Sequence, residues 1–156
     1  MYTDTIEIET NSFSVNLKLN SLISVATGYS STGKTFLVKM LELLKEINLK
    51  RINKSNISMD DIVVCRTKND IEILLNNGNA LKGKTIFIDR YDYLHSDKLN
   101  KFILSGNNRI IIMSHTFYNE LNLNAEAFII IKYDKEKRLF YTEKVLDHLS
   151  IDEEII

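Results

Sequence analysis

Five short apolar runs constrain the fold more than any other feature of this sequence. Each run is four or five residues long, and segments with helical spacing of apolar residues separate most of them. Strands of a parallel sheet are apolar on both sides because helices cover both of its faces. We therefore expect parallel strands at residues 22–26, 62–65, 85–88, 110–113 and 128–131.

Three segments between these runs predict helices. The first follows residue 35, the second ends near Gly78, and the third begins after Ser96, whose hydroxyl is suited to an N-cap. Their apolar positions are Leu37, Met40, Leu41, Leu44 and Ile47 in the first helix, Ile71, Leu74 and Leu75 in the second, and Leu99, Phe102 and Ile103 in the third.

The two ends of the chain have a different pattern. Residues 6–19 alternate between apolar and polar side chains, which predicts two half-exposed antiparallel strands joined at Thr10 and Asn11. Residues 127–145 indicate a hairpin that turns at 134–137, and residues 145–156 a short closing helix or tail. The sequence thus predicts one α/β domain over residues 1–156, with a doubly wound, mostly parallel five-stranded sheet flanked by helices, N-terminal antiparallel strands and a C-terminal hairpin.

Composition excludes several classes of function. The 20 basic and 21 acidic residues are interspersed and give a net charge of -1, so nucleic-acid binding is not indicated. There is no apolar run of about 18 residues and no signal-peptide pattern, so we expect a cytoplasmic protein that does not enter the membrane. Cys65 is the only cysteine, which excludes an internal disulfide and leaves no support for a zinc site.

The segment "GYSSTGKT", residues 28–35, joins the first apolar run to the first predicted helix and reads G-x-x-x-x-G-K-T. Such a loop presents backbone N–H groups and the positive end of a helix dipole to phosphate oxygens. Glycines allow the tight turn and the close approach, the lysine reaches the β- and γ-phosphates, and the threonine hydroxyl coordinates Mg²⁺. We expect a nucleoside triphosphate to be bound by Gly28, Ser30, Ser31, Thr32, Gly33, Lys34, Thr35 and Phe36.

A bound metal also needs an acidic partner at the end of a neighbouring strand. Asp89 directly follows the apolar run 85–88 and meets this requirement. We therefore expect Thr35 and Asp89 to hold Mg²⁺ when ATP is bound.

With "GYSSTGKT" as Walker A and "TIFID" as Walker B, the chain resembles the P-loop NTPase superfamily over about residues 6–131. The segment "IIIMSHT", residues 110–116, is similar to the switch-histidine segment of ABC-type ATPases, and the pattern is closest to minimal ABC-type or RecA-like ATPases. This resemblance implies a strand between the Walker A and Walker B strands, from which Ser114 or His115 senses the γ-phosphate. The alternative for His115 is that it caps the next helix.

Two features differ from that branch. Residues 66–84 are too few to hold the ABC signature subdomain, and "LSGNN" at 104–108 instead predicts a helix end at Gly106. In addition, Arg90 occupies the position of the glutamate that polarises water, and an arginine cannot accept a proton. Asp92 would substitute if its turn brings it inward; otherwise it is a solvated turn carboxylate. Slow or partner-dependent hydrolysis is expected.

Two alternatives to an ATPase remain open. The segment "IDRYDYLHS" also resembles thymidylate kinases, in which the arginine, here Arg90, helps to hold the acceptor phosphate. Residues 116–124, however, contain no Arg or Lys for a lid that excludes water. Arg90 as an ordinary surface residue is the third option for that position. The other alternative is a non-hydrolysing interaction module, against which the intact Lys34 and Thr35 argue.

The sequence therefore predicts an ATP-binding P-loop NTPase that hydrolyses Mg-ATP slowly or with a partner, or uses nucleotide binding as a switch. Its candidate catalytic residues are His115, Asp92 and Arg90. Because no arginine finger is evident, a homo-oligomer or an activating protein partner is a further expectation. No base-reading motif such as N-K-x-D indicates which nucleotide is preferred.

Overall fold

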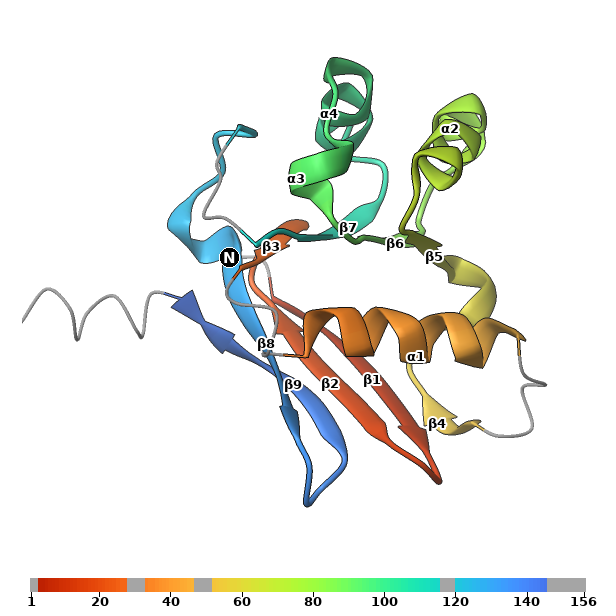
Figure 1. The fold of residues 1–156 in the computed structure, drawn as a ribbon, viewed down its shortest axis with the longest axis vertical. Helices are drawn as coiled ribbons and strands as arrows, with labels where there is room; N and C mark the ends of the chain where they lie inside the picture. Colours follow the sequence, from red (N-terminus) through yellow and green to blue (C-terminus); the bar gives the residue numbers. More distant parts are fainter. Residues whose placement is uncertain (1–2, 28–32, 47–51, 116–119, 146–156) are drawn as a thin grey trace, which may run out of the picture.

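A curved nine-stranded sheet runs through the computed structural model of the chain, which describes residues 3–27, 33–46, 52–115 and 120–145 (Figure 1). One half is parallel and the other contains antiparallel pairs. The spatial order is β4 (Ile52–Ser55), β1 (Asp4–Thr10), β2 (Ser14–Leu19), β9 (Leu139–Lys144), β8 (Phe128–Asp134), β3 (Ile23–Ala26), β7 (Arg109–Met113), β6 (Thr85–Ile88) and β5 (Ile62–Cys65).

This architecture shows that the fold class expected from the sequence is wrong. The sheet is not a doubly wound, mostly parallel sheet of five strands; it is mixed, has nine strands and curls into a half-barrel. The five apolar runs do form adjacent parallel strands, but these make up only one half of the sheet. The predicted N-terminal pair and C-terminal hairpin continue the same sheet.

The pairing of β2 with β9 explains why the sequence pattern did not reveal this sheet. These two strands run parallel, with Val15 opposite Phe140. The Lys18 backbone N–H donates to Thr142 Oγ1 at 2.9 Å, across a sequence separation of 124 residues. Local periodicity identifies strands but carries no information on which distant strand pairs with which. Strand β4 was not predicted, because its sequence "INKS" has one apolar residue and no alternation.

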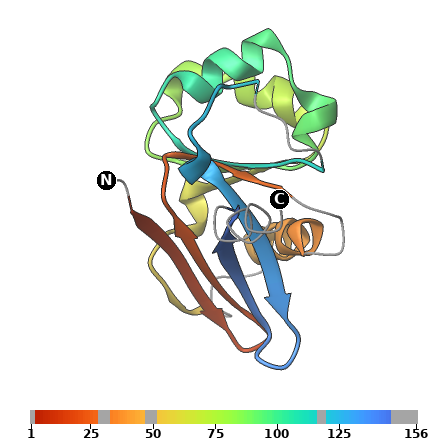
Figure 2. The same cartoon turned by 90° about the vertical axis from the view of Figure 1, so that its left-hand side faces the viewer.

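Helix α1 (Lys34–Glu46) lies on the concave side of the curled sheet, in the angle between its two halves (Figures 1 and 2). Its apolar face is buried there. The alternating strands β1 and β2 turn one set of side chains toward the same core and the other set outward. The buried residues of these three elements are Leu37, Val38, Leu41, Leu44, Ile6, Ile8, Val15, Leu17 and Leu19.

The other face of the parallel half is covered by α2 (Lys68–Asn76), α3 (Tyr91–Leu94) and α4 (Asp97–Leu104) (Figure 1). Two of their N-termini are capped. Thr67 and Asp70 form a reciprocal capping box at α2. The predicted cap at Ser96 is confirmed, since its Oγ accepts from the Leu99 N–H at 3.2 Å. Short 3₁₀ turns occupy Met59–Asp61, Gly78–Ala80 and Ala125–Ala127.

The predicted hairpin is confirmed as β8 and β9, which pair from Ile129–Lys144 to Asp134–Leu139. Gly106, with φ of 78°, follows the end of α4 as the sequence indicated. Most of the expected closing helix or tail, residues 146–156, lies outside the described residues. Within the described part of the chain, none of the helices has the length and apolar character needed to cross a bilayer.

Candidate functional site

The candidate site lies where three parallel strands end. β7 is between β3 and β6, since it pairs with β3 through Met113 and Ala26 and with β6 through Ile112 and Ile88. The carboxyl ends of parallel strands meet at one edge of a sheet. Thr27, Asp89 and Ser114, which directly follow these strands, therefore share this edge. This is the strand order that the resemblance to ABC-type and RecA-like ATPases implied.

The end of the glycine-rich loop is fixed by Gly33. Its backbone φ of 110° is rarely adopted by residues other than glycine, and an added Cβ would lie 3.3 Å from the Cβ of Tyr133. The Gly33 carbonyl accepts from the Leu37 N–H at 2.9 Å, so α1 begins immediately after it. Four other predicted ligands, Gly28, Ser30, Ser31 and Thr32, lie outside the described residues.

Lys34 is the first residue of α1, and its side chain is buried although it carries an ammonium group. Burial lowers the pKa of Lys34, and the negative charges of Asp89 and Asp92 raise it by a smaller amount. The ammonium is therefore held near two carboxylates in surroundings that disfavour its charge. An anion bound beside it would relieve this cost.

Asp89 is buried at the end of β6 with its two oxygens in different environments. Oδ1 accepts from the Arg90 backbone N–H at 3.0 Å. Oδ2 is buried and makes no hydrogen bond within the described part of the chain. Arg66 Nε lies 3.6 Å from Oδ2, which is beyond a normal hydrogen bond.

Asp92 lies in the first turn of α3. Its Oδ1 is also buried and without a hydrogen-bond partner among the described residues. Arg90, two residues earlier, adopts a left-handed conformation, with φ of 57°. Asp92 is only partly exposed and its charge acts to raise the pKa of Lys34, so it is not a fully solvated turn carboxylate.

The orphaned oxygens of Asp89 and Asp92 test whether these residues fit a metal. Mg²⁺ prefers carboxylate and hydroxyl oxygens, and it commonly takes one or two from the protein and the rest from phosphate and water. One free oxygen on each carboxylate, next to the start of α1 where Thr35 lies, suits such a site. The described residues contain no group of three or more His, Cys, Asp or Glu side chains that would hold a metal alone.

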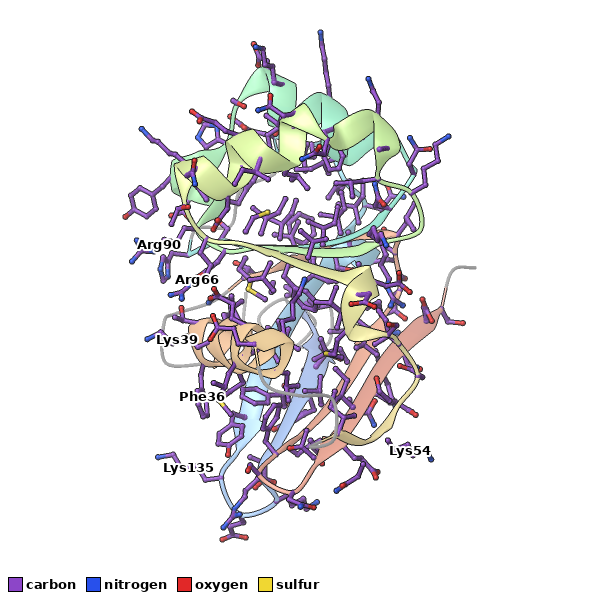
Figure 3. All side chains as sticks on the ribbon, turned by 90° about the vertical axis from the view of Figure 1, so that its right-hand side faces the viewer. Phe36, Lys39, Lys54, Arg66, Arg90 and Lys135 are labelled. Atoms are coloured by element: carbon purple, nitrogen blue, oxygen red, sulfur yellow. The ribbon has the colours of Figure 1, made fainter. Side chains whose placement is uncertain are left out.

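The arginines at this edge have different roles. The Arg90 side chain is exposed and makes no capping bond to α3. Arg66, which follows β5, was not singled out by the sequence. It forms a 2.9 Å ion pair with Glu42 of α1 and lies 3.6 Å from Asp89, so it links the two carboxylates. Its position directly after an apolar strand is the same signal that identified Asp89. Figure 3 shows Arg66 and Arg90 along one side of the molecule with Lys39 and Phe36.

The end of β7 supplies the last predicted residues. Ser114 is buried, and its backbone N–H donates to the Ala26 carbonyl at 3.1 Å, beside the start of the glycine-rich loop. His115 is exposed at the same edge. The alternative in which His115 caps a helix falls on residues 116–119, outside the described residues.

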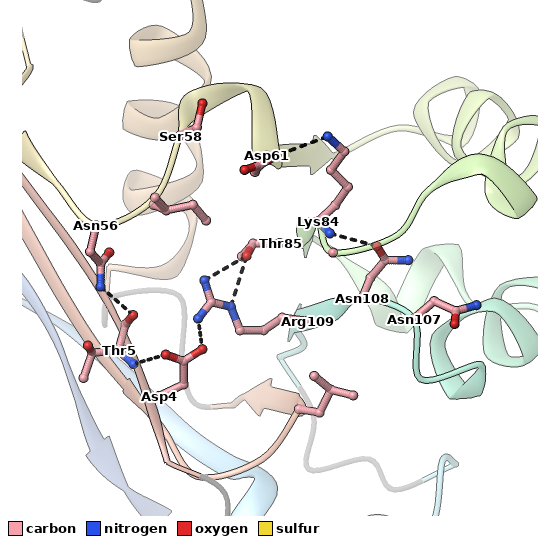
Figure 4. A pocket seen from close by; sticks show the side chains of 13 residues that line it. Asp4, Thr5, Asn56, Ser58, Asp61, Lys84, Thr85, Asn107, Asn108 and Arg109 are labelled. Atoms are coloured by element: carbon pink, nitrogen blue, oxygen red, sulfur yellow. Dashed lines mark hydrogen bonds and ion pairs between the residues drawn. The ribbon is translucent and has the colours of Figure 1, made fainter.

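A cavity of about 450 Å³ lies at the opposite edge, where β6 and β7 begin (Figure 4). Its charged side chains are already paired. Arg109 donates to Thr85 Oγ1 from Nε at 3.0 Å and from Nη2 at 2.9 Å and also pairs with Asp4. Lys84 pairs with Asp61 at 3.1 Å. These contacts tie the β1 edge to the parallel strands, and we assign no ligand to this cavity.

Comparison of the chain with known proteins gave no matching family, no matching curated protein and no matching solved structure.

Proposed function

We propose that this protein binds a nucleoside triphosphate with Mg²⁺ at the edge formed by β3, β7 and β6, and hydrolyses it slowly or with the help of a partner. The observation that carries this proposal is the pair of buried, unbonded oxygens, Asp89 Oδ2 and Asp92 Oδ1, beside the buried Lys34. Leaving such atoms unpaired costs stability, so their retention favours a ligand that uses them.

The phosphates would be held by groups that precede and begin α1. The N-terminal N–H groups of a helix attract anions, and the buried Lys34 is the first residue of α1. Thr35 and Asp89 would hold Mg²⁺, which supplies positive charge to the phosphate oxygens when it is bound. Binding would therefore bring negative charge to the buried Lys34 and positive charge to the buried Asp89.

Asp92 is the group that can accept a proton from water at this site. Arg90 cannot act as a base, and its side chain is exposed. Asp92 has a buried oxygen that makes no hydrogen bond within the described part of the chain and is close enough to Lys34 to affect its pKa. Ser114 and His115 are at the same edge and would respond to the γ-phosphate. Because no glutamate follows Asp89, Asp92 would have to activate water alone, which is consistent with slow turnover.

The test is product analysis with γ-labelled ATP and Mg²⁺, with and without a nucleoside or nucleoside monophosphate. We expect free phosphate in both reactions, and none from Lys34→Ala. Phosphorylated acceptor would instead establish a kinase. Asp97→Asn, in the exposed first turn of α4, is the matched control and should keep full activity. If calorimetry detects no Mg-ATP binding at millimolar concentration, the proposal fails and an interaction module is favoured.

A further inference from the structure

We propose that Phe36 is the stacking platform for the base of the bound nucleotide, and that Tyr133 and Phe140 hold its ring in place. This inference rests on the proposed function and extends it to the part of the ligand beyond the phosphates. It also predicts that the site accepts different bases.

The direction in which the nucleotide leaves the phosphate site follows from the strand order. Lys34 and Asp89 define the end where the β- and γ-phosphates bind, and Asp89 lies on the β7 and β6 side of β3. The ribose and base must therefore extend away from Asp89. On the other side of β3 lies β8, whose residue Tyr133 is 3.3 Å from the position of a Cβ on Gly33.

An aromatic cluster occupies that side of the loop. The ring centroids of Phe36 and Tyr133 are 5.0 Å apart at an interplanar angle of 82°, and those of Phe36 and Phe140 are 5.2 Å apart. Tyr133 and Phe140 are 4.6 Å apart, so each ring contacts both others. Figure 3 shows Phe36 on the side of α1 opposite to Arg66 and Arg90.

The three rings differ in exposure. Phe140 is completely buried, whereas Phe36, in the first turn of α1, is 42% exposed. A large apolar ring that is both exposed and held by two neighbours loses little conformational freedom when a flat ligand binds on it. It lies two residues after Lys34, at the same end of α1 as the proposed phosphate site.

Stacking on an aromatic side chain tolerates any base, because every base has a π-face. Typical stacking strengths correspond to about tenfold to hundredfold in affinity. We therefore expect Mg-ATP and Mg-GTP to bind with affinities within about threefold of each other. Inorganic tripolyphosphate should bind more weakly than either, because it has no base.

The experiment compares Mg-ATP, Mg-GTP and Mg-tripolyphosphate binding by calorimetry in the natural protein, Phe36→Ala and Leu43→Ala. Leu43 is the matched control, since it is 44% exposed two turns further along the same helix. Phe36→Ala should weaken both nucleotides about tenfold or more and leave tripolyphosphate unchanged. Leu43→Ala should change none of the three.

A second variant gives a direct signal. The chain contains no tryptophan, so Phe36→Trp places a single indole at the platform, and Leu43→Trp places one at the control position. Mg-ATP should quench the fluorescence of the first and not of the second, and tripolyphosphate should quench neither.

Three results would overturn the inference. The first is an unchanged nucleotide affinity in Phe36→Ala. The second is a loss of tripolyphosphate affinity in Phe36→Ala as large as the loss of nucleotide affinity, which would mean that Phe36 shapes the phosphate loop, and the third is quenching of the Phe36→Trp indole by tripolyphosphate. If the natural protein binds neither ATP nor tripolyphosphate, the proposed function fails together with the platform. If tripolyphosphate binds as tightly as ATP and GTP, the proposed phosphate site is supported and only the stacking platform is contradicted.

Discussion

Arg66 Nε and Asp89 Oδ2 face each other at the ends of β5 and β6, 3.6 Å apart, and neither atom makes a hydrogen bond within the described part of the chain. The same guanidinium holds Glu42 of α1 at 2.9 Å. Arg66 therefore balances the charge of Asp89 without a hydrogen bond to its Oδ2. This arrangement suits a carboxylate that must accept a metal ion, since the arginine can give way to a second positive charge.

Arg66→Gln should destabilise the nucleotide-free protein because it leaves the buried Asp89 carboxylate unbalanced. We expect the Tm to fall by about 3–8 °C, which corresponds to roughly 1–2 kcal/mol in a protein of this size. Mg-ATP should raise the Tm of the variant more than that of the natural protein, because Mg²⁺ then supplies the missing charge. Glu42→Gln, which removes only the partly exposed ion pair between Arg66 and Glu42, is the control in calorimetry. An equal fall in the Tm of this variant would contradict the role of Arg66 in balancing Asp89.

Lys34→Met should make the nucleotide-free protein more stable while it abolishes nucleotide binding. The pKa of Lys34 is lowered from its usual 10.5, so the folded state disfavours its charge at neutral pH. We expect the Tm to rise by about 2–4 °C. The difference should be constant near neutral pH and shrink as the pH rises toward 10.5, where the unfolded lysine also loses its proton. A lower Tm in the variant would mean that balancing Asp89 outweighs the cost of burial.

Asp92→Asn should separate binding from hydrolysis. If Asp92 accepts the proton of the attacking water, single-turnover hydrolysis should fall by about 10²–10⁴-fold while the affinity for Mg-ATP changes little. Asp89→Asn should instead weaken the Mg²⁺ dependence of binding. Retained hydrolysis in Asp92→Asn would transfer the role of the base to another group.

Cys65 should be unreactive in the folded protein. It is 1% exposed, and burial raises its pKa to about 12, so the thiolate is absent at pH 8. Thiol reagents should modify it at the rate of local or global opening and should react at once after denaturation in urea. A fast reaction in the native state would show that the end of β5 opens readily. Arg66, the next residue, would then not be held firmly beside Asp89.

The sequence predicted the parts of the site that depend on local rules. Asp89 follows an apolar run, Gly33 precedes a helical pattern, and Ser96 stands before another; each is a short-range signal. The left-handed conformation of Arg90, directly before α3, could not be predicted, because residues other than glycine rarely adopt it. The contact of Tyr133 with Gly33 depends on the pairing of β8 with β3, so it requires the folded sheet.

The fold class was predicted wrongly for the same reason. The alternation in residues 6–19 identified β1 and β2 and their buried faces, but the surface that buries them is α1 and the curled sheet. That surface exists only when β9 joins the two halves through the Val15 and Phe140 pair. Such pairing stabilises the protein only after the long loop between the two strands has been closed. A short stretch of neighbouring residues therefore carries no signal of this pairing.

The pairing of β2 with β9 also sets an order for the making of this protein. Translation produces β1, β2 and α1 before β9, the strand that completes the wall around α1 and begins at residue 139. On the ribosome, the apolar face of α1 has no complete cover until the β8–β9 hairpin has emerged. The helix that carries Lys34 is thus synthesised well before the strand that completes its enclosure.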